Sequence, residues 1–167
     1  MKEEQKLLVD EFIFHSRILL DLLETLNKED LLQSPVAKSG SFGKQFRHII
    51  DIEKSYLEAL EVGKLDYYRV SVDHSLEADK ESLERELKTL NEKVIESVGK
   101  YNHDDFNQKT IDGTKASKYL GASYRRISPR EVLLLLIEHE IFHEGELALY
   151  CRSTNRKFPG SWFIWGL

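Results

Sequence analysis

Two histidines four residues apart near the C-terminus are the residues whose types and spacing point most directly to chemistry. His139 and His143 lie in VLLLLIEHEIFHEGELALYCR, a stretch expected to be helical. Residues at this spacing share one helix face, with Cβ atoms about 5–6 Å apart, so both imidazoles can meet one ion. The pair continues the face of Leu135 and Leu136, which should point inward, where an imidazole without a polar partner is costly. We therefore expect a shared metal ion, although spacing alone leaves open two histidines satisfied in the core or at the surface.

The same five residues spell His-Glu-Ile-Phe-His, which matches the H-E-x-x-H pattern of zinc metalloproteases. In that reading Glu140 is the general base, and a third ligand lies further along the chain. No Asp, Glu or His follows Glu146, however, up to Leu167. The chain also shows little strand that could align a peptide substrate, so we do not expect a protease.

The third ligand is expected upstream, at His48. It lies on the inward side of a helix expected at residues 42–62, about one and a half turns from its start. Of the six histidines, His15 is expected to pack in the core, and His74 and His103 lie in loop or helix-end contexts rich in Asp. Three imidazoles that leave positions open for water or substrate are the pattern of a catalytic metal site rather than a closed structural one.

Four long segments must position these side chains. Each carries apolar residues in steps of three and four, which is typical of amphipathic helices. The last begins at Ser128-Pro129-Arg130-Glu131, where a serine cap, a proline at the first position and a glutamate at the third make a capping box. The expected helices span residues 3–27, 42–62, 75–101 and 129–153. They predict an all-α four-helix bundle, with a single domain over residues 1–167.

The connections are less regular. Residues 64–73 lack helical periodicity and are expected to form an extended crossover. Residues 111–127, rich in Gly, Ser and Thr, are expected to be irregular. The aromatic tail NRKFPGSWFIWGL should fold back on the bundle. Several aromatic residues of these segments are expected either to line the pocket or to pack the end of the bundle. They are Tyr67, Tyr68, Tyr119, Tyr124, Trp162 and Trp165.

Composition excludes several classes of protein. The formal net charge of −5 does not provide the basic surface that binding to a nucleic-acid backbone requires. The longest apolar run, residues 132–137, is far too short to span a membrane, and the N-terminus lacks the apolar stretch of a signal peptide. The one cysteine, Cys151, suits a reducing compartment. We therefore expect a soluble cytoplasmic protein that acts on a small molecule, without nucleic-acid or membrane partners.

The order of these residues resembles the DinB/YfiT-like family. The resemblance is carried by residues 41–48 (SFGKQFRH), residues 139–145 (HEIFHEG) and Arg152 before the Pro-Gly tail, and it covers essentially the whole chain. It implies a four-helix bundle in an up-down-down-up arrangement, with a long crossover between the second and third helices. It also implies a divalent metal, zinc or nickel, held at the positions matching His48, His139 and His143. Some members of the family are thiol S-transferases that use bacillithiol or mycothiol.

This sequence departs from the family after the second histidine of the pair. Where Arg-Gly-Gln often follows, Glu144-Gly145-Glu146 stands here. Two acids beside the histidine pair would raise the local negative charge, which favours a cation and disfavours an anionic substrate group. Glu146 lies one turn past His143, where it could accept a hydrogen bond from a ring N–H or act as a fourth ligand, or else be a solvated acid of the helix surface.

Three functions remain open. The leading one is a metal-dependent enzyme whose ion activates a thiol or water nucleophile, which would make it a low-molecular-weight thiol S-transferase with bacillithiol or a similar thiol as cosubstrate, or a hydrolase. The second is a non-catalytic metal-binding or stress-responsive protein, and the third is a helical interaction module with a vacant site. The aromatic tail additionally predicts a homodimer, because such residues are enriched at the cores of interfaces.

Overall fold

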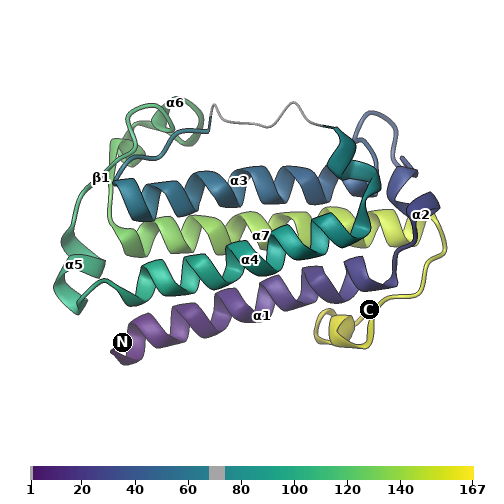
Figure 1. Cartoon of the computed structure of the whole chain (residues 1–167), viewed down its shortest axis with the longest axis horizontal. Helices are drawn as coiled ribbons and strands as arrows, with labels where there is room; N and C mark the ends of the chain where they lie inside the picture. The colour runs from purple at the N-terminus through teal and green to yellow at the C-terminus, as the bar shows by residue number, and fades with distance from the viewer. Residues whose placement is uncertain (1, 68–73) are drawn as a thin grey trace.

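Four long helices lie side by side in the computed structural model, which describes residues 2–67 and 74–167 (Figure 1). They are α1 (Glu3–Thr25), α3 (Phe42–Val62), α4 (Lys80–Gly99) and α7 (Pro129–Ser153). Helix α3 packs against α4 and α7, and α1 packs against the same two helices, which closes a four-membered ring. Helices α1 and α7 run in one direction, and α3 and α4 run in the other. The all-α four-helix bundle with an up-down-down-up arrangement is therefore confirmed.

Shorter elements occupy the connections. They are α2 (Lys28–Leu32), η1 (Ser75–Ala78), α5 (His103–Gln108), β1 (Ile111–Asp112), α6 (Ser117–Leu120), η2 (Ala122–Arg125), β2 (Arg126–Ile127) and η3 (Gly160–Trp165), where η denotes a 3-10 helix. Strands β1 and β2 pair antiparallel, with Ile111 opposite Ile127. The stretch expected to be irregular, residues 111–127, thus contains two short helices and a minimal sheet.

Two of the expected helices are shorter than predicted. The first ends at Thr25 rather than near Asn27, because Leu26 is extended and Asn27 caps α2 instead, accepting a hydrogen bond from the Asp30 backbone N–H at 2.9 Å. The third begins at Lys80 rather than Ser75, because the side chain of Asp79 caps it there. In both places a local cap competes successfully with continued helical periodicity.

The segment that follows α3 is tied to β1. Gly63 ends the helix with φ of 81°, a left-handed conformation that glycine adopts without steric cost. The Leu65 N–H then donates to the Asp112 carbonyl oxygen at 2.9 Å, and the Asp112 N–H donates to the Gly63 carbonyl oxygen at 2.9 Å. The rest of the crossover expected at residues 64–73 lies, from residue 68, outside the described residues.

Close backbone contact fixes η1 against the first turn of α3. A Cβ atom added to Gly43 would lie 1.8 Å from the carbonyl oxygen of Glu77, so only glycine fits at this position. The side chain of Glu77 in turn accepts a hydrogen bond from Arg47 Nε at 2.8 Å. The entry into α4 is therefore anchored one turn from His48.

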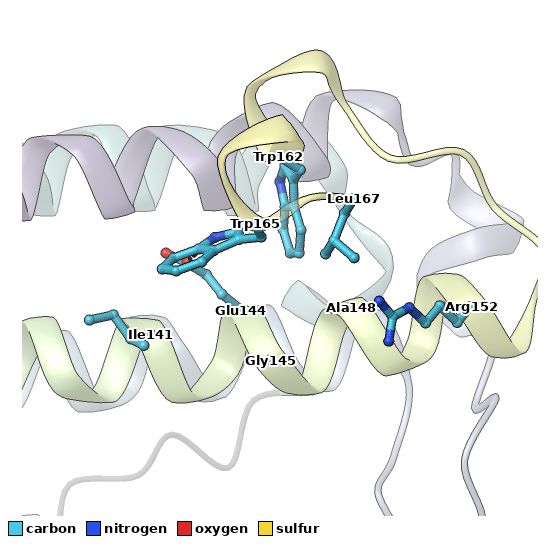
Figure 2. Close-up of a pocket in the computed structure, with 8 residues that line it drawn as sticks. All are labelled: Ile141, Glu144, Gly145, Ala148, Arg152, Trp162, Trp165 and Leu167. Carbon is cyan, nitrogen blue, oxygen red and sulfur yellow. Dashed lines mark hydrogen bonds between the residues drawn. The ribbon is translucent and has the colours of Figure 1, made fainter.

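The C-terminal tail folds back on the bundle, as the sequence predicts (Figure 2). The Trp162 ring is buried, and its Nε1–H donates to the carbonyl oxygen of Ile18 at 3.0 Å. The Trp165 Nε1–H donates to Glu144 Oε2 at 3.1 Å. The two indole groups thus attach the tail to α1 and to α7 at separate points.

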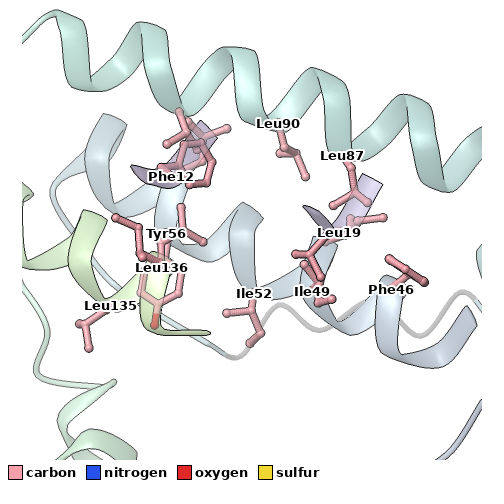
Figure 3. Close-up of a cluster of buried hydrophobic side chains, with 14 of the residues drawn as sticks. Phe12, Leu19, Phe46, Ile49, Ile52, Tyr56, Leu87, Leu90, Leu135 and Leu136 are labelled. Atoms are coloured by element: carbon pink, nitrogen blue, oxygen red, sulfur yellow. The ribbon is translucent and has the colours of Figure 1, made fainter. Parts of the chain in front are cut away.

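Apolar side chains from all four long helices fill the interior (Figure 3). They include Phe12 and Leu19 of α1, Phe46 and Ile49 of α3, Leu87 and Leu90 of α4, and Leu135 and Leu136 of α7. Burying one such side chain contributes about 1.5–3 kcal/mol. The core therefore stabilises the bundle without help from an ion. None of the helices in the described ranges combines the length and apolar character needed to cross a membrane.

The capping box at the start of α7 yields a stability prediction. Ser128 Oγ accepts a hydrogen bond from the Glu131 N–H at 3.3 Å, and the Ser128 N–H donates to Glu131 Oε2 at 2.6 Å. Ser128→Ala should lower the free energy of unfolding by about 1 kcal/mol in urea titrations, because a helix N–H loses its acceptor. Ser34→Ala, at an exposed loop position, is the control and should change it by less than about 0.5 kcal/mol. Equal losses in both variants would contradict the capping role.

Candidate metal centre

The three histidines expected to act together converge where α3 packs against α7. His139 Nε2 lies 3.4 Å from His48 Nε2 and 3.1 Å from His143 Nε2. One nitrogen from each ring lies within 4.8 Å of the other two. The expected approach of the rings is thus confirmed, and ligation of an ion stays a prediction.

The helices bring the three rings together at steep angles to one another. His139 and His143 project from one face of α7, with ring centroids 4.4 Å apart and planes at 71°. His48 comes from the second turn of α3 and meets His143 at 5.0 Å and 73°. The His48 and His139 planes are tilted by 58°, so no two of the rings stack, and their Nε2 atoms lie close together.

The spacing of these nitrogens fits a transition-metal ion. Two ligand atoms that are each about 2.1 Å from one ion are about 3.0 Å apart at an octahedral angle and about 3.4 Å apart at a tetrahedral angle. The two Nε2–Nε2 separations to His139, 3.1 and 3.4 Å, fall in this range. The donor set is also suitable, because neutral imidazole is a good ligand for zinc and nickel.

Burial keeps all three histidines neutral. It lowers the pKa of His139 to about 2, with the nearby His143 and His48 adding to the effect. Burial and the proximity of His48 lower the pKa of His143 to about 3. The pKa of His48 is also lowered, by burial and by Arg47 and Lys44, against the opposing influence of Asp51. Neutral rings present lone pairs, which is the state that binds a metal ion.

The other ring nitrogens of the pair on α7 are incompletely satisfied. Nδ1 of His139 and Nδ1 of His143 are buried, and neither makes a hydrogen bond to any described residue. Glu146 Oε2 does lie 2.8 Å from His143 Nδ1, but the angle at the ring is not that of a hydrogen bond. Glu146 is therefore beside His143, but it does not accept the ring hydrogen bond that was one of the sequence alternatives. It is not among the atoms that converge around the Nε2 group.

Glu144 does not flank the histidines as the sequence suggested. Its Oε1 lies 2.8 Å from His15 Nδ1, and its Oε2 accepts the hydrogen bond from Trp165, so the side chain points toward α1 and the tail. The expected pair of acids beside the metal ligands is thus reduced to Glu146. The reason is helix geometry, since consecutive residues project about 100° apart around the axis. The expectation that His15 packs in the core is confirmed.

Glu140, the residue that would be the base of a metalloprotease, is also directed into the bundle. It is 1% exposed, and its Oε1 accepts a hydrogen bond from Ser16 Oγ at 2.9 Å. Burial and the nearby carboxyl of Glu53 raise the pKa of Glu140 well above its usual value. Burial likewise raises the pKa of Glu53 to about 8. Held among helices α1, α3 and α7, Glu140 is not placed to activate water at the histidines.

A cleft of about 480 Å³ opens beside the histidines. It is lined by Lys44, Gln45, Arg47, His48, His139, Phe142, His143 and Glu146. Arg47 is buried and held by Asp51 and Glu77, each at 2.8 Å, whereas Lys44 is exposed. These basic residues were not singled out from the sequence. Lys44 stands one turn before His48 on the same face of the helix, and that spacing was the signal available for it.

The aromatic residues expected at the pocket divide between two places. The Tyr67 hydroxyl donates to the Tyr56 hydroxyl at 2.8 Å. The centroid of the Tyr56 ring is 6.5 Å from that of His139, so this tyrosine pair lies near the histidines. Trp162 and Trp165 instead line a separate cavity on another side of α7. The rings of Tyr119 and Tyr67 meet edge to face, with centroids 6.5 Å apart, and Tyr124 packs against the core. Tyr68 lies outside the described residues.

Comparisons of the sequence and of the structure with known proteins point to the same group of proteins. A family model described as the DinB family matches residues 1–160. An uncharacterized Bacillus subtilis protein, YjoA, is 24% identical over 148 residues, which is 89% of each chain. The crystal structure of that DinB-like protein superposes with a TM-score of 0.68, at 21% identity, over 90% of this chain and 93% of the other. A DinB-like protein from Bacillus cereus also gives a TM-score of 0.68, at 17% identity, with 92% and 94% of the chains covered. At these identities the solved structures establish the fold alone.

The lowered histidine pKa values predict how stability depends on pH. Between the folded values, about 2 for His139 and about 3 for His143, and the unfolded value of about 6.5, the unfolded chain binds more protons than the folded chain. The stability contributed by the neutral rings is therefore present above about pH 6.5. It is lost as pH falls, by at most about 1.4 kcal/mol per pH unit for each ring.

The prediction is tested by urea unfolding of wild type and His143→Gln, both with a chelator, at about pH 7.5 and about pH 5. The variant should lose less free energy of unfolding than wild type over this interval, because it has one histidine fewer to protonate on unfolding. The raised pKa of Glu53 acts in the opposite direction, and this carboxyl is common to both proteins. Identical pH dependences would show that His143 is not held neutral.

Proposed function

Because the chain belongs to the DinB family, we propose that it is a metal-dependent enzyme that activates a small nucleophile, either a low-molecular-weight thiol or water. The observation that carries the proposal is the convergence of three neutral histidine Nε2 atoms at the edge of an open cleft. A closed structural site would be surrounded by protein. Here His48 and His139 are only half-buried, and the cleft leaves room for a substrate.

His48, His139 and His143 would hold the ion, and zinc and nickel are both metals that three imidazole donors suit. Such an ion lowers the pKa of a bound water or thiol toward neutrality, which is the chemistry that the protein itself lacks at this place. The chain supplies the orientation of the rings. Because the pKa values of His139 and His143 are low, protons do not compete with the ion for these rings at neutral pH.

Residues around the cleft would bind and orient the substrate. Phe142 offers an exposed apolar ring, and Lys44 offers a positive charge for an anionic group. Glu146 Oε2, next to His143, could take up a proton from an incoming thiol or water, since burial raises the pKa of this carboxyl. Of the two acids that follow His143, Glu144 is turned away and Glu146 alone opposes an anionic thiol such as bacillithiol, so the sequence argument against such a cosubstrate is weakened.

Metal binding by the three histidines is predicted first. Zinc should raise the melting temperature of wild type, because an ion that binds only the folded state stabilises it. His143→Ala should bind zinc at least about 100-fold more weakly, since two imidazoles remain, while circular dichroism still reports a folded bundle. His74→Ala, at the exposed histidine just before η1, is the matched control and should bind as wild type does.

A His143→Ala variant that gains as much melting temperature from zinc as wild type would show that His143 is not a ligand. A variant that is unfolded with and without zinc would assign the site a structural role. The catalytic proposal would then lose its support.

Turnover separates an enzyme from a non-catalytic metal-binding or stress-responsive protein. Zinc- or nickel-loaded wild type should conjugate a low-molecular-weight thiol to an electrophilic bimane dye, or hydrolyse an activated ester, and His143→Ala should lose at least about 100-fold in kcat/KM. His74→Ala should retain full activity. If the loaded protein binds metal stoichiometrically but accelerates neither reaction across a panel of thiols and esters, the non-catalytic function is the correct one.

A homodimer also remains a prediction, and it is proposed to involve the tail. Phe163 is 80% exposed and Ile164 is 58% exposed, more than ordinary packing of a bundle end requires. Light scattering at tens of micromolar should give about twice the chain mass, and Phe163→Ser should shift the protein toward monomer. A monomeric wild type of 19.5 kDa would contradict the dimer.

A further inference from the structure

A second cavity, of about 310 Å³, lies between α7 and the C-terminal tail. We call it the tail pocket. It is lined by Ile141, Glu144, Gly145, Ala148, Arg152, Trp162, Trp165 and Leu167 (Figure 2). At about 100° per residue, the α7 residues of the tail pocket and those of the histidine cleft are centred roughly 150° apart around the helix. The two hollows therefore lie on different sides of α7.

Hydrogen bonds fix the wall that the tail provides. Trp162 is attached to the Ile18 carbonyl, and Trp165 is attached to Glu144, whose other oxygen meets His15. The His15 ring also stacks on the Trp165 ring, with centroids 6.1 Å apart and planes at 24°. The indoles are thus positioned before any ligand arrives, which lowers the entropic cost of binding.

Small residues form the floor of the tail pocket. Gly145 lies in the interior of α7, where glycine costs up to about 1 kcal/mol relative to alanine. Apart from the adjacent residues and the backbone of α7 itself, no atom of the described residues lies within 4 Å of the position that a Cβ would occupy there, so no close-packed neighbour explains the glycine. Ala148, one turn further, also lines the cavity. Together they leave the space above α7 open.

Of the two charged side chains that line the tail pocket, Glu144 has partners and Arg152 has none among the described residues. Both oxygens of Glu144 have partners, in His15 and Trp165. Arg152 is exposed, and within residues 2–67 and 74–167 it has neither an ion pair nor a side-chain hydrogen bond. Figure 2 shows its guanidinium group directed back along α7 toward Ala148. Among the side chains that line the tail pocket, the available charge is therefore positive and lies at one end of an apolar cavity.

We propose that the tail pocket binds a small carboxylate with a flat apolar body, of the arylalkanoic acid class. The ring of the ligand lies against Trp165 and the floor at Ala148, and its carboxylate pairs with Arg152, whose planar fork matches a carboxylate. A volume of 310 Å³ holds about ten water-sized groups, which suits a single ring with a short acidic chain. The site is independent of the proposed metal function, because none of its lining residues is one of the three histidines.

Calorimetric titration of metal-free protein with phenylpropanoate, and with the neutral phenylpropanol, tests the proposal. Wild type should bind the acid at least about tenfold more tightly than the alcohol, because only the acid pairs with Arg152. Arg152→Gln should remove this preference and leave both ligands equally weak. Arg125→Gln, an exposed arginine in η2 at the other end of the bundle, is the matched control and should bind as wild type does.

Ala148→Phe fills the floor and should abolish binding of both ligands. Retained zinc-dependent stabilisation and an unchanged circular dichroism spectrum would show that this variant is folded, and His143→Ala should still bind phenylpropanoate as wild type does. The proposal is overturned if wild type binds neither ligand at millimolar concentration, if acid and alcohol bind equally, or if folded Ala148→Phe binds as tightly as wild type. Failure of zinc binding with intact phenylpropanoate binding would count against the metal centre alone.

Discussion

The packing of α3 against α7 is the contact on which the rest of the site depends. Contacts such as that between the rings of Phe42 and Tyr150, whose centroids lie 5.1 Å apart, hold the two helices together, and this places His48 opposite the His139 and His143 pair. The same packing removes the rings from water, and the loss of hydration keeps them neutral. Neutral imidazoles can hydrogen-bond to one another at these distances, and the same Nε2 atoms can instead share a cation. The core thus creates the geometry for a ligand, while remaining stable without it.

Neighbouring residues of helix α7 contact different parts of the structure. The histidine pair faces α3 and the open cleft, whereas Glu140 and Glu144 face α1 and the tail. An acid beside a metal ligand in sequence is therefore not beside the metal in space. As a result, the carboxyl groups of Glu140 and Glu144 do not enter the cleft. Glu144 instead accepts the hydrogen bond from Trp165 of the tail. Glu144 thus belongs to the attachment of the tail.

Much of this could be predicted from the sequence, because helical periodicity reports which face of a segment is buried. Periodicity gave the bounds of α3, the capping box gave the start of α7, and the inward face identified His48. Periodicity does not report which neighbour a buried face meets, so the partners of Glu144 and the tail pocket could not be foreseen. The cap at Asn27 had a visible signal, with Asp30 three residues later, but the apolar stripe of α1 continues to Leu26 and obscured it.

X-ray absorption spectroscopy of zinc-loaded protein tests the central claim most directly, since it reports the identity and distance of the atoms bound to the ion. The account predicts three imidazole nitrogens at about 2.0–2.1 Å, with one or two further light atoms from solvent, and one imidazole fewer in His48→Ala. A sulfur neighbour at about 2.3 Å, which would implicate Cys151, or a spectrum without the multiple scattering of imidazole rings, would contradict it.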